Sequence, residues 1–475
     1  MLFHIVRKEL LDQLLSLRFA IACVVCLVVF VLSSLVLARD YREAMSTYNM
    51  NQVIHRNELL QRTEVWSLYQ GVKVNRPLNT MNVLVRGIAG DLTESIQVRQ
   101  DNHLDFPETY EQNPVLPLFP SVDFVFIVGI ILSLLALAFA YDGVSGERES
   151  GVLKLMLSYS APRDLVLLGK WLGGYLALIA PFTAAFVIAL LIAALFPEVQ
   201  PTLDNSLAIA GLLILALLYL AAIYSLGVLV SCRTSLPSTS ITVLLLIWVA
   251  FILAAPNMAP YITSQLFPAP SRESIDREKM ELQRERYSRF QEMVEEWKEE
   301  KGLGDEDNWY ADDDLRARSD AYREEVEAEM QKVEDDYLVR IQSQTRLSGI
   351  VARVSPLTSF NLAAYDMAAA GIAQETAFVE ALKAYSQSWE EYTEEKNRAF
   401  RELMEKQRSA GVSPTPEMWE QFRHADFADY PRFSFDHMPF NQRLSLIYTD
   451  VGLLVVWNVL FFMGAYLSFL KYDVQ

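Results

Sequence analysis

The chain has 475 residues, of which 52% are hydrophobic and 21% are charged, a mixture that favours alternating apolar and polar blocks over a single soluble globule. The net charge of −18 argues against a nucleic-acid-binding protein, because phosphate contacts need a clustered basic face and the sequence has none. Residues 257–448 contain 24 Lys and Arg against 38 Asp and Glu, so this region carries most of the negative charge. The simplest interpretation of this negative charge is that it keeps residues 257–448 soluble.

Residues 1–18 form the first predicted element, an amphipathic helix. Its apolar side chains fall on one helical face and its charged side chains largely on the other. The apolar face comprises Phe3, Val6, Leu10, Leu14 and Leu17. Such a helix is suited to lie in the membrane interface before the first membrane span.

Six apolar stretches are long enough to cross a bilayer, since about 20 residues at 1.5 Å each traverse the hydrocarbon core. They are residues 19–38, 122–141, 172–195, 206–230, 237–256 and 449–470. The first is predicted to be an uncleaved anchor, because no small-residue cleavage pattern follows it. The Lys and Arg residues of the short connections all fall on one side, which the positive-inside rule assigns to the cytoplasm together with both termini.

Residues 39–121 are predicted to lie outside the cytoplasm. They begin as a helix to about Glu64 and continue with three short strands in the stretches VKVNRP, MNVLVRG and ESIQVRQ, where β-branched residues alternate with polar ones. A proline-rich segment then returns the chain to the membrane. Asp123, at the start of the second span, is either a functional intramembrane carboxylate or an exposed end charge, and the second reading is favoured.

The second outer region, residues 257–448, is predicted to be a mainly helical extracytoplasmic domain. In two stretches of this region apolar residues recur alternately three and four positions apart, the seam pattern of coiled-coil-like helices. The two stretches predict an antiparallel helical hairpin with its tip near residues 301–314. A short apolar stretch from Pro356 to Gly371 is expected to pack on the membrane surface. A third seam is formed by Phe378, Leu382, Tyr385, Trp389, Tyr392, Ala399 and Leu403. Its aromatic residues suit the core of the domain better than a groove for a cargo or partner helix.

The sequence contains no recognisable catalytic constellation. Gly169-Lys170 is followed by Trp171 and lacks the Gly-rich turn of a phosphate loop. The five histidines show no metal-binding spacing, and the three cysteines, Cys23, Cys26 and Cys232, lie in or beside apolar stretches. The acidic tip of the hairpin lacks calcium-loop spacing and is expected to be solvated. We therefore expect no enzyme activity, no metal and no cofactor on this chain.

The segment from Tyr141 to Phe182 is the candidate functional region. It leaves one span, carries both signs of charge and enters the next span. Residues 151–158 predict a short amphipathic helix, and Pro162-Arg163 predict a break. A segment of this kind can press on a soluble partner, although an ordinary cytoplasmic loop is the simpler alternative.

The pattern D-x-x-S-G-E-R-E-x-G-x-L, followed by P-R and L-G-K, resembles the permease subunits of ABC exporters of the type-2 class. The similarity is greatest to the branch described as permeases for multicopper-enzyme maturation, which carries large extracytoplasmic insertions. Gly151-Val152-Leu153 departs mildly from the G-T-L that such permeases often have. The resemblance implies that the ATPase-coupling residues are Asp142, Glu147, Arg148, Glu149, Gly151, Leu153, Arg163, Gly169 and Lys170.

The resemblance further implies a cytoplasmic ABC ATPase dimer as partner, which would hold ATP and Mg²⁺, and a second permease chain, identical or related. The expected fold is an all-α polytopic membrane protein with an N-terminal interfacial helix, six transmembrane helices, a large helical extracytoplasmic domain and a small β element. The expected location is the bacterial inner membrane. An alternative function is force transmission to an extracytoplasmic enzyme or machine without transport of cargo, and an extracytoplasmic protein partner stays open under both functions.

Overall fold

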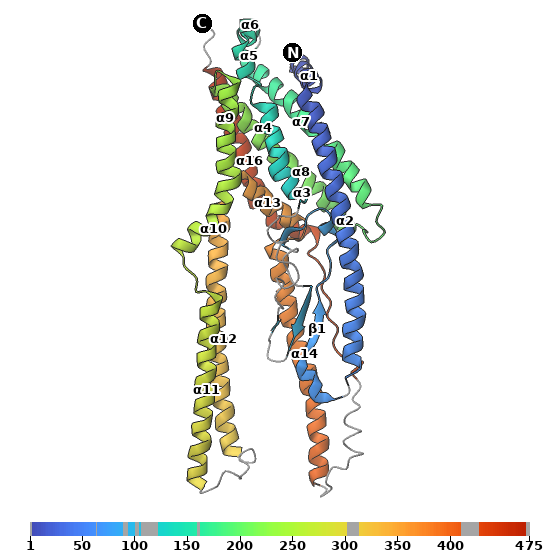
Figure 1. Cartoon of the computed structure of the whole chain (residues 1–475), viewed down its shortest axis with the longest axis vertical. Coiled ribbons are helices and arrows are strands. Elements are labelled where there is room, and N and C mark those ends of the chain that lie inside the picture. Colours follow the sequence, from blue (N-terminus) through green and yellow to red (C-terminus); the bar gives the residue numbers. More distant parts are fainter. Residues whose placement is uncertain are drawn as a thin grey trace. The chain divides into compact units, whose positions relative to one another are not determined.

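The computed structural model describes residues 2–62, 64–88, 94–99, 104–105, 122–158, 162–301, 313–409 and 427–471 (Figure 1). The chain divides into two compact units. The first combines Met1–Ile252 with Pro356–Gln475, and the second is Leu253–Ser355. The first unit contains most of the membrane helices and a second layer with a small sheet. This layer, called the outer layer below, contains the end of α2 (Leu17–Leu60), the sheet, much of α14 (Ile372–Ser409) and residues 427–435. The second unit contains a helical hairpin.

Six helices within the described residues are long and apolar enough to cross a membrane, which confirms the predicted polytopic helical fold. They are α2 (Leu17–Leu60), Phe124–Glu149, α7 (Arg163–Ala193), α8 (Leu203–Arg233), Pro237–Leu266 and α16 (Phe440–Leu470). Most of these helices continue beyond the apolar stretches, because backbone hydrogen bonding does not end where the hydrocarbon ends. The 44 residues of α2 extend about 66 Å, roughly twice the thickness of the hydrocarbon core.

Two of the membrane helices contain a π-helical turn. The helix Phe124–Glu149 comprises α3 (Phe124–Phe126), η6 (Ile127–Leu132), α4 (Ser133–Ala140) and α5 (Ser145–Glu149). The helix Pro237–Leu266 comprises α9 (Pro237–Trp248), η7 (Val249–Ala254) and α10 (Ala255–Leu266). The indole of Trp248 donates to the hydroxyl of Ser133 at 2.9 Å, and Tyr219 on α8 donates to the carbonyl of Gly129 at 2.9 Å. These bonds satisfy polar groups at the irregular turns, as an apolar environment requires.

The N-terminal helix is shorter than predicted. Helix α1 covers Leu2–Leu14, and a new helix begins at Leu17 after a break. The hydroxyl of Ser16 caps α2 by accepting from the amide of Phe19 at 3.3 Å. Leu17 therefore belongs to the membrane helix and not to the amphipathic face of residues 1–18.

Helix α13 (Pro356–Met367) lies inside the helical bundle, not on the membrane surface as its apolar stretch suggested. Phe360 stacks on Tyr219 with ring centroids 4.8 Å apart. Two glycines on neighbouring helices allow α13 to approach closely. A Cβ at Gly129 would stand 2.6 Å from Leu357, and one at Gly211 would stand 2.8 Å from Met367. The small residues of neighbouring helices thus decide where α13 packs.

The outer layer contains a three-stranded antiparallel sheet of β1 (Val72–Asn75), β2 (Ser95–Val98) and β3 (Leu104–Asp105). Val72 pairs with Val98 and Val74 with Ile96, so these apolar side chains share one face. That face forms a core with α14 (Ile372–Ser409) through Phe378, Leu382, Tyr385, Trp389 and Tyr392. The third seam is therefore packed core over these residues, while the side chains of Ala399 and Leu403 lie outside the described residues.

The stretch MNVLVRG does not form the predicted strand. Residues Thr80–Val83 form a 3₁₀ turn, η2, because Asn79 accepts from the amide of Met81 at 3.0 Å and caps it. The same side chain donates to the carbonyls of Ala368 and Ala369 at 2.7 and 3.0 Å. A long-range polar contact thus overrides the β-propensity of the stretch.

Asp123 is buried rather than exposed at the end of the second span. Its carboxylate accepts from the amide of Phe126 at 2.9 Å and from the amide of Arg86 at 3.1 Å. Asp123 is therefore a helix cap that also fixes the chain before the span.

The second unit contains the antiparallel hairpin of α11 (Arg272–Lys301) and α12 (Asp313–Ala352), as predicted. The buried apolar residues of these two helices, where the structure describes them, are Ile275, Trp297, Leu315, Val326 and Ala352. Glu334 on α12 pairs with Arg272 at 2.6 Å and with Lys279. Residues 302–312 of the tip, and the proline-rich residues 107–120 of the first outer region, lie outside the described residues.

Trp389 is the largest wholly buried side chain among the residues that the structure describes, and its truncation should destabilise the outer core. We expect Trp389→Ala to lower the free energy of unfolding by about 3–5 kcal/mol, through lost packing and an unfilled cavity. Thermal unfolding of the full chain in nanodiscs measures the effect. The exposed Gln387 on the same helix supplies the control, and Gln387→Ala should change the midpoint little. Equal midpoints for the two variants would contradict the packing role of Trp389.

Candidate functional site

The candidate site is the end of the first unit where α1, α5, α6 (Val152–Ser158) and the start of α7 gather (Figure 1). The last turns of α8 and α16 reach the same end. All nine residues singled out from the sequence belong to this region: Asp142 lies in the turn before α5, and the others lie on α5, α6, α7 or the turns between them.

Lys170 is the centre of the site. It is 6% exposed, and its ammonium lies 2.7 Å from Glu147 on α5 and 3.3 Å from Glu9 on α1. Burial raises the pKa of Glu9, and the Lys170 ammonium acts in the opposite direction. A buried cation with two carboxylates joins three separate segments at one point, so none of the three can move away alone without leaving a charge unpaired.

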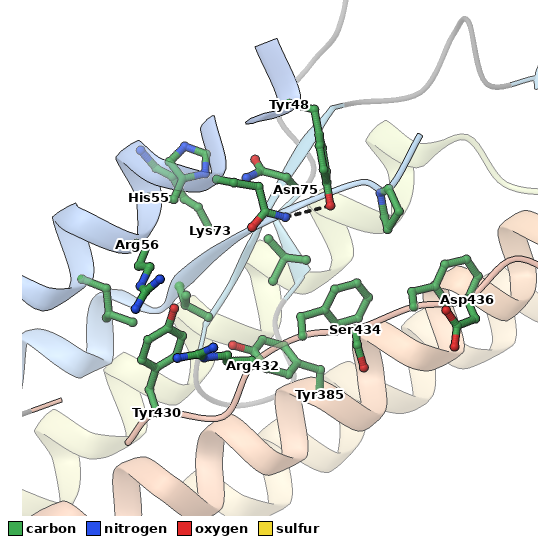
Figure 2. A pocket seen from close by; sticks show the side chains of 17 residues that line it. Tyr48, His55, Arg56, Lys73, Asn75, Tyr385, Tyr430, Arg432, Ser434 and Asp436 are labelled. Carbon is green, nitrogen blue, oxygen red and sulfur yellow. Dashed lines mark hydrogen bonds between the residues drawn. The ribbon is translucent and has the colours of Figure 1, made fainter. Parts of the chain in front are cut away.

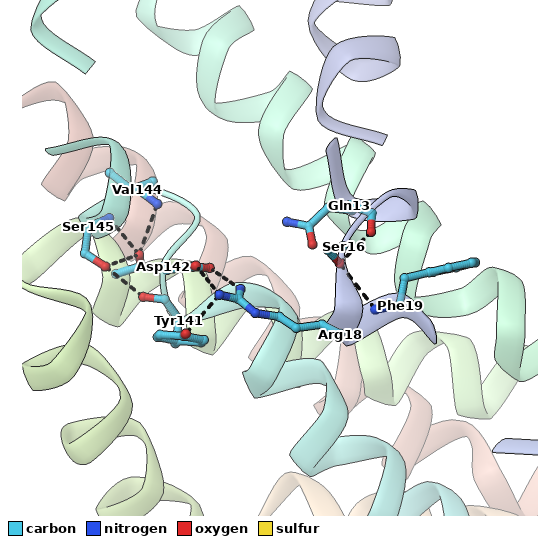
Figure 3. A network of polar contacts seen from close by, with 9 residues as sticks. Gln13, Ser16, Arg18, Phe19, Tyr141, Asp142, Val144 and Ser145 are labelled. Carbon is cyan, nitrogen blue, oxygen red and sulfur yellow. Dashed lines mark hydrogen bonds and ion pairs between the residues drawn. The ribbon is translucent and has the colours of Figure 1, made fainter. Parts of the chain in front are cut away.

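Arg18 makes the second ionic contact, at the start of α2 (Figure 3). Its guanidinium binds Asp142 through both nitrogens, at 2.8 and 2.7 Å, and donates to the hydroxyl of Tyr141 at 3.0 Å. The guanidinium also stands 4.9 Å from the centroid of the Tyr141 ring. This two-pronged geometry holds the beginning of the charged segment against the first membrane helix.

The segment is tied to α8 and α16 as well. The amides of Val144 and Ser145 both donate to the hydroxyl of Ser231, at 3.1 and 3.0 Å. Arg148 donates to the carbonyl of Thr234 at 3.3 Å, just after α8. Arg163 donates to the carbonyl of Leu470 at 2.8 Å, at the end of α16. Three membrane helices, α2, α8 and α16, therefore contact the segment through polar bonds.

Helix α1 docks on α7 over two glycines spaced four residues apart. A Cβ at Gly169 would stand 2.6 Å from a side-chain carbon of Ile5, and one at Gly173 would stand 2.6 Å from the Cβ of Glu9. The glycines thus let the two helices approach closely enough for Glu9 to reach Lys170. Gly169, inferred from the resemblance as a coupling residue, is a packing position for α1.

The exposed part of the site is α6 and the turn before it. Leu153 is buried, whereas Val152 and Leu155 are 41% and 63% exposed. Glu149 and Gly151 are also exposed, and Gly151 has a φ of +75°, a conformation that side-chain-bearing residues rarely adopt. The apolar faces of α6 thus point both into the protein and away from it.

The sequence interpretation found Lys170 and Glu147 but not their partners. Glu9, Arg18, Ser231 and Gly173 were missed, and only two signals could have revealed them: the spacing of Gly169 and Gly173, and the cation at the start of the first span. Among the described residues, no group of three His, Cys, Asp or Glu could hold a metal ion. The site consists of ion pairs and helix contacts, which connect segments of the chain to one another.

Comparison with known proteins decides the family. The model of the ABC-2 family transporter proteins matches residues 3–474, nearly the whole chain. The chain belongs to this family. The expected resemblance to a type-2 ABC permease is thereby confirmed, and the ABC-2 chain is a polytopic membrane protein.

Two curated relatives of the ABC-2 chain carry the same description, probable ABC transporter permease protein NosY. The protein of Pseudomonas aeruginosa is 35% identical over 127 residues, which are 26% of this chain and 45% of the relative. The protein of Stutzerimonas stutzeri is 41% identical over 68 residues, which are 14% of this chain and 25% of the relative. The matched segments thus span less than half the length of either relative.

Removing the buried cation should destabilise this end of the ABC-2 chain. Lys170→Met leaves the carboxylates of Glu9 and Glu147 together without a counterion, so we expect a loss of about 3–5 kcal/mol in unfolding free energy. The triple variant Lys170→Met, Glu9→Gln, Glu147→Gln should recover most of it. Thermal unfolding in nanodiscs measures both, and Lys383→Met, which removes an exposed lysine on α14, is the control. If the triple variant were no more stable than Lys170→Met, the ion pairs would not be the cause.

Enlarging Gly173 should release α1 from α7. In a background where the three native cysteines are alanine, Ile5→Cys reports the contact through its rate of labelling by a thiol reagent. We expect Gly173→Leu to accelerate labelling several-fold, since the leucine occupies the place of Glu9. Gly452→Leu on α16 is the matched control, because nothing lies within 4 Å of a Cβ there. Unchanged labelling in the Gly173 variant would refute close glycine packing.

Proposed function

We propose that the ABC-2 chain is the membrane permease subunit of an ABC transporter and works as an exporter. ATP and Mg²⁺ would bind a cytoplasmic ATPase dimer on separate polypeptides, because this chain has no recognisable phosphate loop. The family membership and the permease description of the two relatives support the proposal. The direction of transport rests on the sequence resemblance to type-2 exporters.

The observation that carries the proposal is the exposure of Val152 and Leu155 on a helix whose opposite face is fixed by buried Leu153. Exposed apolar side chains flanked by Glu149 and Lys154 are suited to the apolar centre and polar rim of a docking surface. We assign this surface, α6 with Glu149 and Gly151, as the place where the ATPase docks.

The remaining coupling residues act inside the permease under this proposal. A push on α6 passes to α5, and from Glu147 through Lys170 to α7 and α1. Asp142 passes it to α2 through Arg18, Arg148 passes it to the end of α8, and Arg163 passes it to the end of α16. The ion pairs let these helices move as a group, which is what alternating access by rigid-body motion needs.

The proposal places the end with α1 and α6 in the cytoplasm of a bacterium, with the protein in the inner membrane. The connections at that end carry the Lys and Arg residues, in agreement with the positive-inside rule. A second permease chain, identical or related, completes the transporter. The outer layer and the hairpin then face the extracytoplasmic side, where an envelope protein is a further partner.

A second candidate function is force transmission without cargo. The length of α2 favours it, because one unbroken helix joins Arg18 at the coupling end to Leu59 in the outer core. Movement of the coupling end would then act on an extracytoplasmic enzyme or machine. Transport of a cargo into vesicles by the purified complex separates the two functions, since the force-transmitting subunit moves none.

The docking surface is tested by Leu155→Asp. We expect co-purification of the ATPase to fall at least about tenfold, because a carboxylate replaces an apolar residue at the centre of the contact. Leu203→Asp is the control, since Leu203 is exposed at the start of α8, at the opposite end of that helix from Arg233. Normal ATPase recovery with Leu155→Asp, in membranes that contain the usual amount of permease, would refute docking on α6.

A further inference from the structure

The outer layer of the first unit contains a pocket that the transport proposal does not use. Its volume is 410 Å³, within the range of small-molecule sites, and its walls come from α2, β1, Tyr385 on α14 and residues 430–436 (Figure 2). The walls come from two distant parts of the sequence, residues 48–77 and residues 385–436, which meet only in the folded chain.

The wall made by residues 430–436 is anchored at both ends. At its start, Tyr392 donates to Asp429 at 2.7 Å, and Tyr385 donates to the carbonyl of Pro431 at 2.9 Å. After it, the amide of Met438 donates to the side chain of Gln374 at 3.1 Å. The opposite wall is a helix and a paired strand. The pocket is therefore preformed, which reduces the ordering that a ligand would have to impose.

The charge of the pocket is opposite to that of the chain. Arg56, Lys73 and Arg432 line it against a single carboxylate, Asp436, although the whole chain has a net charge of −18. Figure 2 shows Arg56 and Arg432 near Tyr430 at one end of the pocket and Asp436 at the other. Lys73 has a carboxylate partner, Glu58, at 3.4 Å. Within the described part of the chain, neither arginine forms an ion pair.

The inner wall of the pocket is polar and includes Asn75 and His55, whose side chains interact with each other. Asn75 is 7% exposed and lines the pocket from β1. Aromatic rings also line the pocket, among them Tyr430 and Phe433. Buried polar atoms beside aromatic walls are characteristic of a site that orients a ligand as well as holding it.

We propose that this pocket binds a small organic anion: a carboxylate or phosphate group at the Arg56 and Arg432 end, carried on an apolar, preferably aromatic, body with a polar substituent for Asn75 or His55. The arginines supply charge-assisted bonds to the anion, and the tyrosine and phenylalanine rings cover the body. Because the pocket lies in the outer layer, the site stands whether or not the chain transports cargo.

The test is isothermal titration of the full chain, in nanodiscs of zwitterionic lipid, with 4-hydroxybenzoate and with phenyl phosphate. We expect at least one to bind with a dissociation constant of about 1 mM or tighter, given its size and the two arginines. The two probes distinguish carboxylate from phosphate. Neutral 4-hydroxybenzamide, cationic tyramine and inorganic phosphate should bind more weakly, since each lacks the anionic group or the apolar body.

The arginine variants decide whether the binding belongs to this pocket. Arg56→Gln and Arg432→Gln should each weaken binding of the better probe about tenfold by removing one charged donor. Both side chains are exposed, so neither change should disturb folding. Arg39→Gln, an exposed arginine on the same helix α2, is the matched control and should leave the affinity unchanged.

The proposal would be overturned by no binding of either anion at millimolar concentration, by equal binding of tyramine, by equal binding of inorganic phosphate, or by the same loss of affinity in the Arg39 variant as in the other two. The last would mean that only the general charge of the surface matters. Binding that survives Arg56→Gln and Arg432→Gln unchanged would place the ligand elsewhere, and so would also refute the site.

Discussion

The ammonium of Lys170 cannot lie eight residues into a membrane helix without counterions, because transfer of an unpaired charge out of water costs several kcal/mol. That constraint positions much of the surrounding end of the protein. Because Glu9 belongs to α1, its pairing with Lys170 requires α1 to lie against α7. The glycines at 169 and 173 make that approach sterically feasible. Glu147 must come from α5, so the polar segment after the second span folds back onto the bundle.

Charged residues of the first unit have two different roles, although the outer layer also contains a paired example in Arg76 and Glu375. At the α1 and α6 end, cations and carboxylates are paired and partly or wholly buried, and they hold segments together. In the outer layer, Arg56 and Arg432 stand exposed around a pocket within a strongly acidic chain. Paired charges inside a protein hold its own segments together, whereas exposed cations beside an apolar wall are available to a ligand from solution.

Local pattern was enough to predict much of this fold from the sequence. Apolar length predicted the six spans, heptad spacing predicted the hairpin, and the residues after Gly151 predicted α6. The errors came from long-range contacts. The partner of Lys170, Glu9, is 161 residues away in sequence, the caps of Asn79 and Asp123 depend on distant segments, and α13 is placed by glycines on other helices. No periodicity reports such contacts, so the contacts that the predicted coupling residues make could not be deduced from the sequence.

The outer core has a consequence for the order of synthesis. The apolar face of the sheet, with Val74, Ile96 and Val98, is covered by α14, and about 280 residues separate Val98 from Phe378 on that helix. At ordinary translation speeds those residues take about 15 to 55 s to emerge. During that time four further membrane spans must also be inserted. The apolar face of the first outer segment therefore stays uncovered, exposed to aggregation and proteolysis, until synthesis has passed Phe378 in the chain of 475 residues.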